Sequence, residues 1–91
     1  MYFVKENKKF RKSFKKYFRS GRINREDVQN VVETLVSGEK LVGYKDHELK
    51  GDFQGIRECH IESDLLLLYQ INEEEKIVIL VNMGSHSDLF K

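Results

Sequence analysis

Two amphipathic helices are predicted in the first part of the chain. Within residues 6–19 the large apolar side chains recur at helical spacing, and lysines and arginines fill the opposite side. A second helix should begin at Asn24, whose side-chain oxygen can cap it, and should end at Ser37 and Gly38. The short connection between the two segments predicts a helical hairpin.

Three later segments have the pattern of β-strands. Residues 55–62 alternate, with Cys59 and Ile61 on one face and Glu58, His60 and Glu62 on the other. Residues 65–71 and 76–83 are nearly continuous apolar runs, which are typical of central strands. The short polar connection between these two runs suits an antiparallel hairpin.

The remaining segments complete the predicted architecture. Residues 2–4 are a short β-prone run, whereas residues 39–54 carry charges and glycines with little periodicity and are predicted to be irregular. We therefore expect residues 1–91 to form a single α+β domain. Its N-terminal strand and two-helix hairpin should pack on one face of a mostly antiparallel four-stranded sheet.

Composition narrows the class of protein. Hydrophobic residues make up 40% of the 91 residues, enough for one compact core, and no apolar run approaches the length of a membrane span. The first residues lack the apolar stretch of a secretory signal, and the single cysteine, Cys59, cannot form an internal disulfide. These features favour a cytoplasmic location.

The net charge of +1 conceals an asymmetry along the chain. Residues 1–22 carry nine of the 16 Lys and Arg residues but only one of the 15 acidic residues. Such a cationic segment occurs both on nucleic-acid-binding surfaces and on ordinary solvated helix faces. Composition alone leaves both interpretations open.

The three histidines are candidate catalytic residues, because the predicted topology brings them together. His60 and Asp64 flank the turn between two strands, and His86 follows the last strand at the same end of the meander. His47 lies in the segment that leads into these strands and can reach that end. We therefore predict a cluster of three imidazoles and one carboxylate at one rim of the sheet.

Two chemistries suit this cluster. Imidazoles can act as general acid and base near neutral pH, and with nearby cations they suit attack of an RNA 2′-hydroxyl on the adjacent phosphodiester, without a cofactor. A metal ion could instead bind the imidazoles and the carboxylate, although the sequence contains no HxH or HExxH spacing. Cys59 is expected in the core, because adjacent strand residues point to opposite faces and would separate it from His60.

Three segments resemble the YafQ branch of the RelE-like bacterial toxins. They carry the patterns D-H-x-L-x-G, G-x-R-x-x-H-x-x-x-D and G-S-H-x-x-L-F in the order and spacing of that family, within residues 44–51, 55–64 and 84–90. The resemblance covers the whole chain, since the family also has an early strand, a basic helical hairpin and a meander. It implies a RelE-like, microbial-RNase-like fold.

The resemblance also implies an activity and partners. Members of this family are mRNA interferases, metal-independent endoribonucleases that enter the ribosomal A site and cleave translated mRNA. A cognate antitoxin restrains them, so the free toxin would be a monomer that forms a hetero-oligomer with its antitoxin. Neither a cofactor nor a membrane would be involved.

Positions that match the family's motifs supply the expected catalytic set, and nearby cations and the basic helix face supply the expected RNA contacts. The catalytic set would consist of His47, His60, Asp64 and His86. In it, His86 would act as general acid to the leaving 5′-oxygen, and the other three as base or orienting groups, leaving a 2′,3′-cyclic phosphate. The residues expected to bind substrate are Lys45, Lys50, Arg57, Asn82 and Phe90. Those expected to dock on ribosomal RNA are Lys8, Lys12, Lys15, Lys16 and Arg19.

One position departs from the family pattern. Asn82 stands four residues before His86, where relatives commonly carry an arginine, and a neutral amide cannot match a guanidinium against phosphorane charge. The alternative prediction is therefore a catalytically weakened RNA-binding or ribosome-binding module of the same fold. A metal-dependent hydrolase is the third interpretation.

Overall fold

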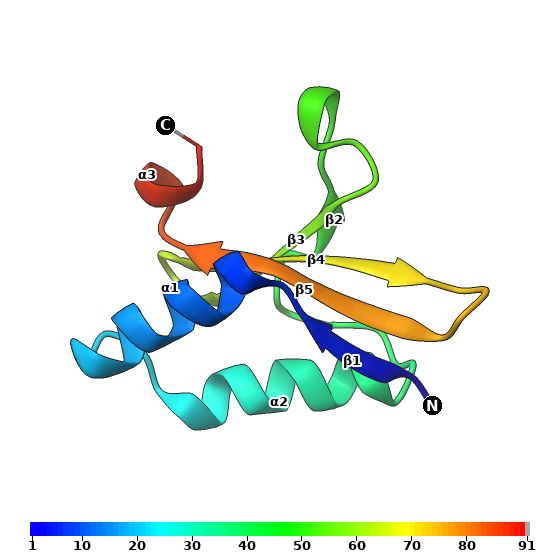
Figure 1. Cartoon of the computed structure of the whole chain (residues 1–91), viewed down its shortest axis with the longest axis horizontal. Helices are drawn as coiled ribbons and strands as arrows, with labels where there is room; N and C mark the ends of the chain where they lie inside the picture. Colours follow the sequence, from blue (N-terminus) through cyan, green and yellow to red (C-terminus); the bar gives the residue numbers. More distant parts are fainter. Residues whose placement is uncertain (91) are drawn as a thin grey trace.

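A five-stranded sheet forms the centre of the protein. The computed structural model describes residues 1–90. The strands are β1 (Phe3–Glu6), β2 (His47–Glu48), β3 (Arg57–Glu62), β4 (Leu65–Asn72) and β5 (Ile77–Gly84). Across the sheet their order is β1-β5-β4-β3-β2 (Figure 1). Because β1 runs parallel to β5 and the other neighbours are antiparallel, the sheet is mostly antiparallel, as predicted.

Helices cover one side of this sheet. Figure 1 shows α1 (Lys8–Arg19) and α2 (Arg25–Val36) on that side, whereas the segment after β2 and the short α3 (His86–Leu89) rise on the other. The Asn24 side chain accepts a hydrogen bond from the backbone N–H of Glu26 at 2.9 Å, which confirms the predicted helix cap. The predicted helical hairpin and the α+β class are therefore confirmed.

The core lies between the helices and the sheet. α1 contributes Phe10 and Tyr17, α2 contributes Val31 and Leu35, and every second residue of β4 faces them. Burial of this much apolar surface is the main stabilising contribution in a domain of this size. Among residues 1–90, no helix combines the length and the apolar character needed to cross a membrane.

Three short elements differ from the sequence prediction. The sheet has five strands rather than four because His47 and Glu48, predicted to be irregular, pair with β3. The 3₁₀ helix η1 (Gly51–Phe53) and the single helical turn of α3 were likewise not predicted. Elements of two to four residues are too short to show a repeating pattern, because a strand is recognised over at least about four residues and a helix over about eleven or more.

Two irregularities in the strands change which side chains are aligned. On β5, Leu80 lies opposite Tyr69 and Asn82 opposite Leu68, so one extra residue bulges between them. On β3, a register shift after His60 redirects Glu62, whose carboxylate accepts a hydrogen bond from the backbone N–H of Asn24 at 3.3 Å. Glu62 therefore does not share the environment of His60, contrary to the simple alternation.

Cys59 is a buried core residue, as predicted. Burial, assisted by the nearby carboxylates of Asp46 and Glu58, raises the pKa of its thiol from an ordinary 9.0 to about 12. Burial and a hydrogen bond with Asp46 also raise the pKa of Tyr69. Both groups hold their protons more tightly in the folded chain than in the unfolded one. Their contribution to stability is therefore complete below pH 9 and is lost as the pH rises.

We expect the free energy of unfolding to fall as the pH rises from 9 to 11. In Cys59→Ala this free energy should fall less steeply with pH. The thiol alone accounts for a slope of about 1.4 kcal/mol per pH unit in that range. Urea denaturation at pH 8, 9, 10 and 11 measures both slopes. Only the difference in slope is diagnostic, because the alanine variant also leaves a cavity. Equal slopes for the two proteins would show that the thiol is not the titrating group.

Candidate functional site

A buried carboxylate joins two of the predicted histidines. The pairing of β2 with β3 places His47 directly opposite Glu58, and His60 follows two residues later on the same face. Glu58 Oε1 lies 3.5 Å from His47 Nε2 and 3.6 Å from His60 Nε2. Glu58 is only 4% exposed. Because a buried carboxylate needs polar partners, these three side chains form one unit.

The orientation of His47 is set from its other side. Its Nδ1 lies 2.8 Å from the backbone carbonyl oxygen of Lys45. A carbonyl oxygen can only accept, so Nδ1 is the protonated nitrogen and Nε2 is turned toward Glu58. Lys45 has a positive φ of 51°, and this unusual backbone conformation points its carbonyl at the ring.

His60 and His86 face one another at the end of the sheet. Their ring centroids are 5.9 Å apart, with the planes inclined at 61°. Asp64, in the turn between β3 and β4, lies with Oδ1 at 3.5 Å from His86 Nδ1 and accepts a hydrogen bond from the backbone N–H of His86 at 3.5 Å. The structure thus brings His60, Asp64 and His86 together, as the meander topology predicts, and connects His47 to them through Glu58.

The two facing imidazoles differ in exposure. The His86 side chain is 57% exposed, whereas that of His60 is 21% exposed and lies beside the buried Glu58. Two imidazoles at this spacing can act on opposite sides of one phosphodiester, one accepting a proton and one donating it. A carboxylate next to each ring can orient it and stabilise the positive charge that develops during proton transfer.

Aromatic side chains border His86. The ring of Phe90 lies 6.0 Å from that of His86, and the ring of Phe53 on η1 lies 5.3 Å from Phe90 in an edge-on arrangement. Phe90 was predicted to contact substrate, but Phe53 was not singled out by the sequence. Together they provide apolar surface on which a nucleobase could stack beside His86.

Arg57 was predicted to bind substrate, but the structure places it elsewhere. It pairs with Tyr69 on β4, on the face of β3 opposite to Glu58 and His60. Its guanidinium forms an ion pair with Asp46 at 3.0 Å. The Tyr69 hydroxyl also donates a hydrogen bond to Asp46. Hydrogen bonding to Asp46 raises the pKa of Arg57 further. Arg57 therefore anchors the segment that carries His47 and is not brought to the imidazoles.

The other predicted substrate ligands lie around the cluster. Lys45 borders a hollow of about 340 Å³ beside His60, and Lys50 is exposed just before η1. Asn82 is aligned across the sheet with Leu68 and Glu58. Its Oδ1 accepts hydrogen bonds from the Ser13 hydroxyl and from the backbone N–H of Met83, both at 2.8 Å. Asn82 therefore joins α1 to β5 through its carbonyl oxygen.

Part of the cluster could also hold a metal ion. Glu58, His60 and His86 each offer one ligand atom, and these atoms lie within 4.8 Å of one another. Two imidazole nitrogens and a carboxylate oxygen are ligands that zinc and copper accept.

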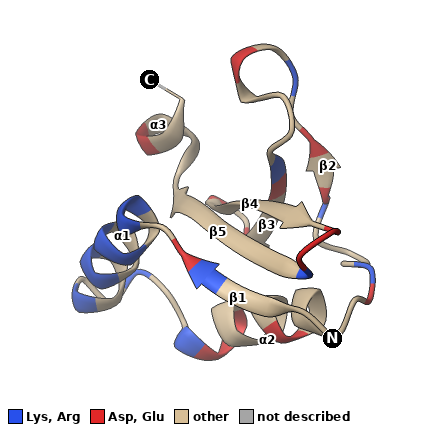
Figure 2. Cartoon of the chain, turned by 45° about the vertical axis from the view of Figure 1, so that its right-hand side comes forward, with Lys and Arg blue, Asp and Glu red and all other residues tan. Residues whose placement is uncertain are grey.

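The basic residues predicted to dock on RNA form one face of α1. Figure 2 shows Lys and Arg along this helix, and each residue of the predicted docking set is exposed. Four side chains line a hollow of about 260 Å³, namely Lys8, Arg11, Lys12 and Lys15. Concentrated positive charge of this kind attracts a polyanion.

Comparison with known proteins identifies the family. A family model described as "Bacterial toxin of type II toxin-antitoxin system, YafQ" matches residues 2–91. The chain belongs to this YafQ toxin family. A crystal structure of a metal-bound toxin from Helicobacter pylori is 42% identical, with a TM-score of 0.92, and the match covers 99% of this chain and 100% of that one.

Relatives from Escherichia coli are more distant members of the YafQ family. The curated "mRNA interferase toxin YafQ" of strain K12 is 38% identical over 47 residues, which are 52% of this chain and 49% of that protein. The match thus spans about half the length of this curated relative. A crystal structure of the E. coli DinJ-YafQ complex shares the fold over 100% of both chains, with a TM-score of 0.85 at 22% identity.

Proposed function

We propose that this YafQ-family protein is an endoribonuclease that cleaves mRNA in the ribosomal A site. The observation that carries this proposal is the facing pair of imidazoles, His60 and His86, each with a carboxylate beside it. Such a pair supplies the general base and the general acid that RNA cleavage needs. The name mRNA interferase toxin, given to the E. coli relative, supports the same activity.

The proposed reaction transfers the phosphodiester to the neighbouring 2′-oxygen. His60 accepts the proton of the 2′-hydroxyl as that oxygen bonds to phosphorus, while Glu58 stabilises the imidazolium that forms. The bond from phosphorus to the 5′-oxygen breaks, and His86, oriented by Asp64, donates a proton to the leaving oxygen. The products are a 2′,3′-cyclic phosphate and a 5′-hydroxyl end.

A translation reaction with the purified protein tests this proposal, after EDTA has stripped the protein of metal and the chelator has been dialysed away, so that the ribosomes keep their Mg²⁺. Primer extension should find new 5′ ends within the codons of a translated mRNA, and the same mRNA without a start codon should stay intact. Binding to ribosomes without any cleavage would instead support the weakened binding module, for which Asn82 is the motivating residue. Cleavage that is lost in the metal-stripped protein and restored by added zinc would support a metal-dependent hydrolase at Glu58, His60 and His86.

We also infer that the partner of this chain is a cognate antitoxin. The E. coli YafQ structure in complex with DinJ supports this inference. The two proteins would form a hetero-oligomer, and the ribosomal target would place the active protein in the cytoplasm. An antitoxin with an acidic segment could cover the cationic face of α1 and so block docking on the ribosome.

Reversing two charges on α1 should weaken ribosome binding. We expect Lys12→Glu/Lys15→Glu to lower the affinity for ribosomes by about tenfold or more at moderate salt and to reduce the dependence of binding on salt concentration. The matched control is Lys5→Glu/Lys40→Glu, which changes the net charge equally with exposed lysines outside α1. Sedimentation with ribosomes at several salt concentrations measures both. Equal losses in the two variants would argue against a specific docking face.

A further inference from the structure

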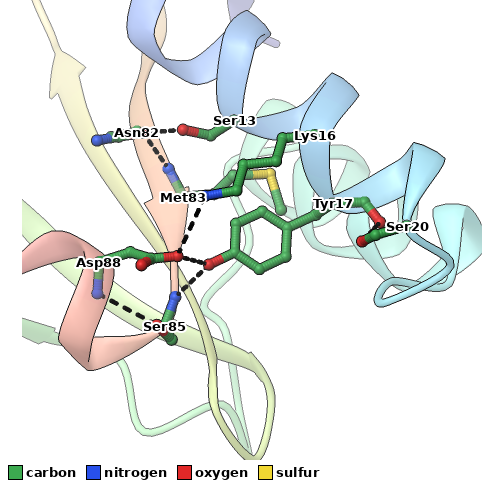
Figure 3. A network of polar contacts seen from close by, with 8 residues as sticks. All are labelled: Ser13, Lys16, Tyr17, Ser20, Asn82, Met83, Ser85 and Asp88. Atoms are coloured by element: carbon green, nitrogen blue, oxygen red, sulfur yellow. Dashed lines mark hydrogen bonds and ion pairs between the residues drawn. The ribbon is translucent and has the colours of Figure 1, made fainter.

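One hydroxyl of α1 holds the turn that carries His86. Tyr17 is only 2% exposed, and its ring belongs to the core. Its hydroxyl donates a hydrogen bond to the Asp88 carboxylate and accepts one from the backbone N–H of Ser85 at 3.0 Å (Figure 3). Ser85 and Asp88 stand on either side of His86 in the sequence. The Tyr17 hydroxyl is therefore bonded to both ends of the turn.

The turn is closely fitted to Tyr17. The Ser85 hydroxyl accepts a hydrogen bond from the backbone N–H of Asp88 at 3.2 Å, which caps α3. A Cβ added at Gly84 would lie 3.2 Å from the Tyr17 hydroxyl oxygen and 3.3 Å from Asp88 Cβ. Glycine thus allows the backbone just before His86 to approach the tyrosine closely.

α3 cannot fix the direction of His86 by itself. It has four residues, and an isolated helix of one turn is unstable in water. The His86 side chain is 57% exposed, and its carboxylate neighbour Asp64 is 68% exposed, so neither is held by surrounding core atoms. The Tyr17 hydroxyl attaches this turn to α1 through a buried hydrogen bond from Ser85 and a partly buried one to Asp88, beside an ion pair of Lys16 with Asp88 at 4.0 Å.

We propose that Tyr17 is a positioning residue for the general acid. Its hydroxyl keeps residues 84–88 in the geometry that turns the His86 imidazole toward His60, without contacting RNA itself. This inference rests on the proposed nuclease activity. A catalytic group displaced by about 1 Å can lose about 10²-fold in rate, so a single distant hydroxyl can matter to the reaction.

Tyr17→Phe tests the proposal, because it keeps the ring in the core and removes only the hydroxyl. We expect kcat for mRNA cleavage to fall by about 10- to 100-fold with KM unchanged. The matched control is Tyr2→Phe, which removes another tyrosine hydroxyl that donates to a carboxylate, that of Glu73 at 2.5 Å, outside the His86 turn. This control should cleave at the wild-type rate. Wild-type kcat in Tyr17→Phe would overturn the proposal.

Amide hydrogen exchange gives a second readout that does not depend on activity. The backbone N–H groups of Leu89 and Phe90 bond to the carbonyls of Ser85 and His86 at 3.0 and 2.9 Å. In Tyr17→Phe these two amides should exchange at least about tenfold faster, whereas those of β4 should keep their wild-type rates. Equal acceleration in β4 would mean global destabilisation and would overturn local positioning. If the wild-type protein cleaves no RNA, the proposed function fails, and exchange still decides whether Tyr17 holds the turn.

Discussion

Replacing His86 with alanine should lower the rate of mRNA cleavage by about 10²–10⁴-fold, the usual contribution of general acid catalysis. His86 is 57% exposed and lies in a single helical turn after β5, so its loss leaves no cavity in the core. The melting temperature should therefore change little. The rate is best measured in single turnover on ribosomes carrying a defined A-site codon, because that excludes product release.

A chemically altered substrate separates the role of general acid from simple RNA binding. When sulfur replaces the 5′-oxygen at the scissile phosphate, the leaving thiolate needs no proton. The loss of rate in His86→Ala should then nearly disappear. Ser87→Ala, a change at the exposed neighbour in α3, should match the wild type on both substrates. If the alanine variant of His86 loses as much rate on the sulfur substrate, His86 does not protonate the leaving group.

The location of the histidine cluster could be predicted from the sequence because it depends on topology alone. A meander of three strands places the turn before Leu65 and the end of the strand before His86 at the same rim. His60, Asp64 and His86 therefore meet whatever the details of packing. The predicted helix cap at Asn24 is local in the same way, because it depends on residues close in the sequence.

Residues whose importance depends on distant pairing could not be predicted. Glu58 lies on the alternating face of His60, but its contact with His47 exists only because the two-residue β2 pairs with β3. The ion pair of Arg57 could not be predicted for a related reason, since its partner Asp46 belongs to the same unpredicted segment. Tyr17 has the pattern of an ordinary core residue of a helix, and its hydroxyl finds its partners only in the folded chain.

The segments that carry His47 and His86 are held in place by different parts of the fold. The Asp46, Arg57 and Tyr69 contacts fix the segment that carries His47, and Tyr17 fixes the turn that carries His86. His60 lies between them on β3, the strand that pairs with both β2 and β4. Catalytic geometry therefore depends on tertiary contacts on the helix side of the sheet as well as on the residues that face RNA.

Glu58→Gln should lower the cleavage rate by about 10²–10³-fold, a loss comparable to that from removing other electrostatic stabilisers. Glutamine keeps the size and an accepting oxygen of the side chain but removes its charge. When His60 accepts a proton, an imidazolium forms at a position that is only 21% exposed, and Glu58 Oε1 at 3.6 Å is placed to stabilise it. Since Glu58 is buried and would not touch RNA, the loss should appear in kcat and not in KM.

A control on the same strand shows whether the loss is specific. Glu62→Gln makes the same chemical change on β3, but the Glu62 carboxylate is bonded to the backbone N–H of Asn24 and not to an imidazole. It should cleave at the wild-type rate. Urea denaturation of both variants checks that they are folded under the assay conditions. A Glu58→Gln protein with wild-type kcat would limit Glu58 to a structural role.

A double-mutant cycle decides through which ring Glu58 acts, because its Oε1 is almost equally distant from His47 and His60. If Glu58 stabilises positive charge on His60, removing its charge in a His47→Ala background should still cost about 10²-fold or more. If Glu58 acts through His47, the double variant should be no slower than His47→Ala alone. The first result assigns His60 as the general base supported by a buried carboxylate. The second transfers that role to His47, whose Nδ1 proton is held by the Lys45 carbonyl and whose Nε2 faces Glu58.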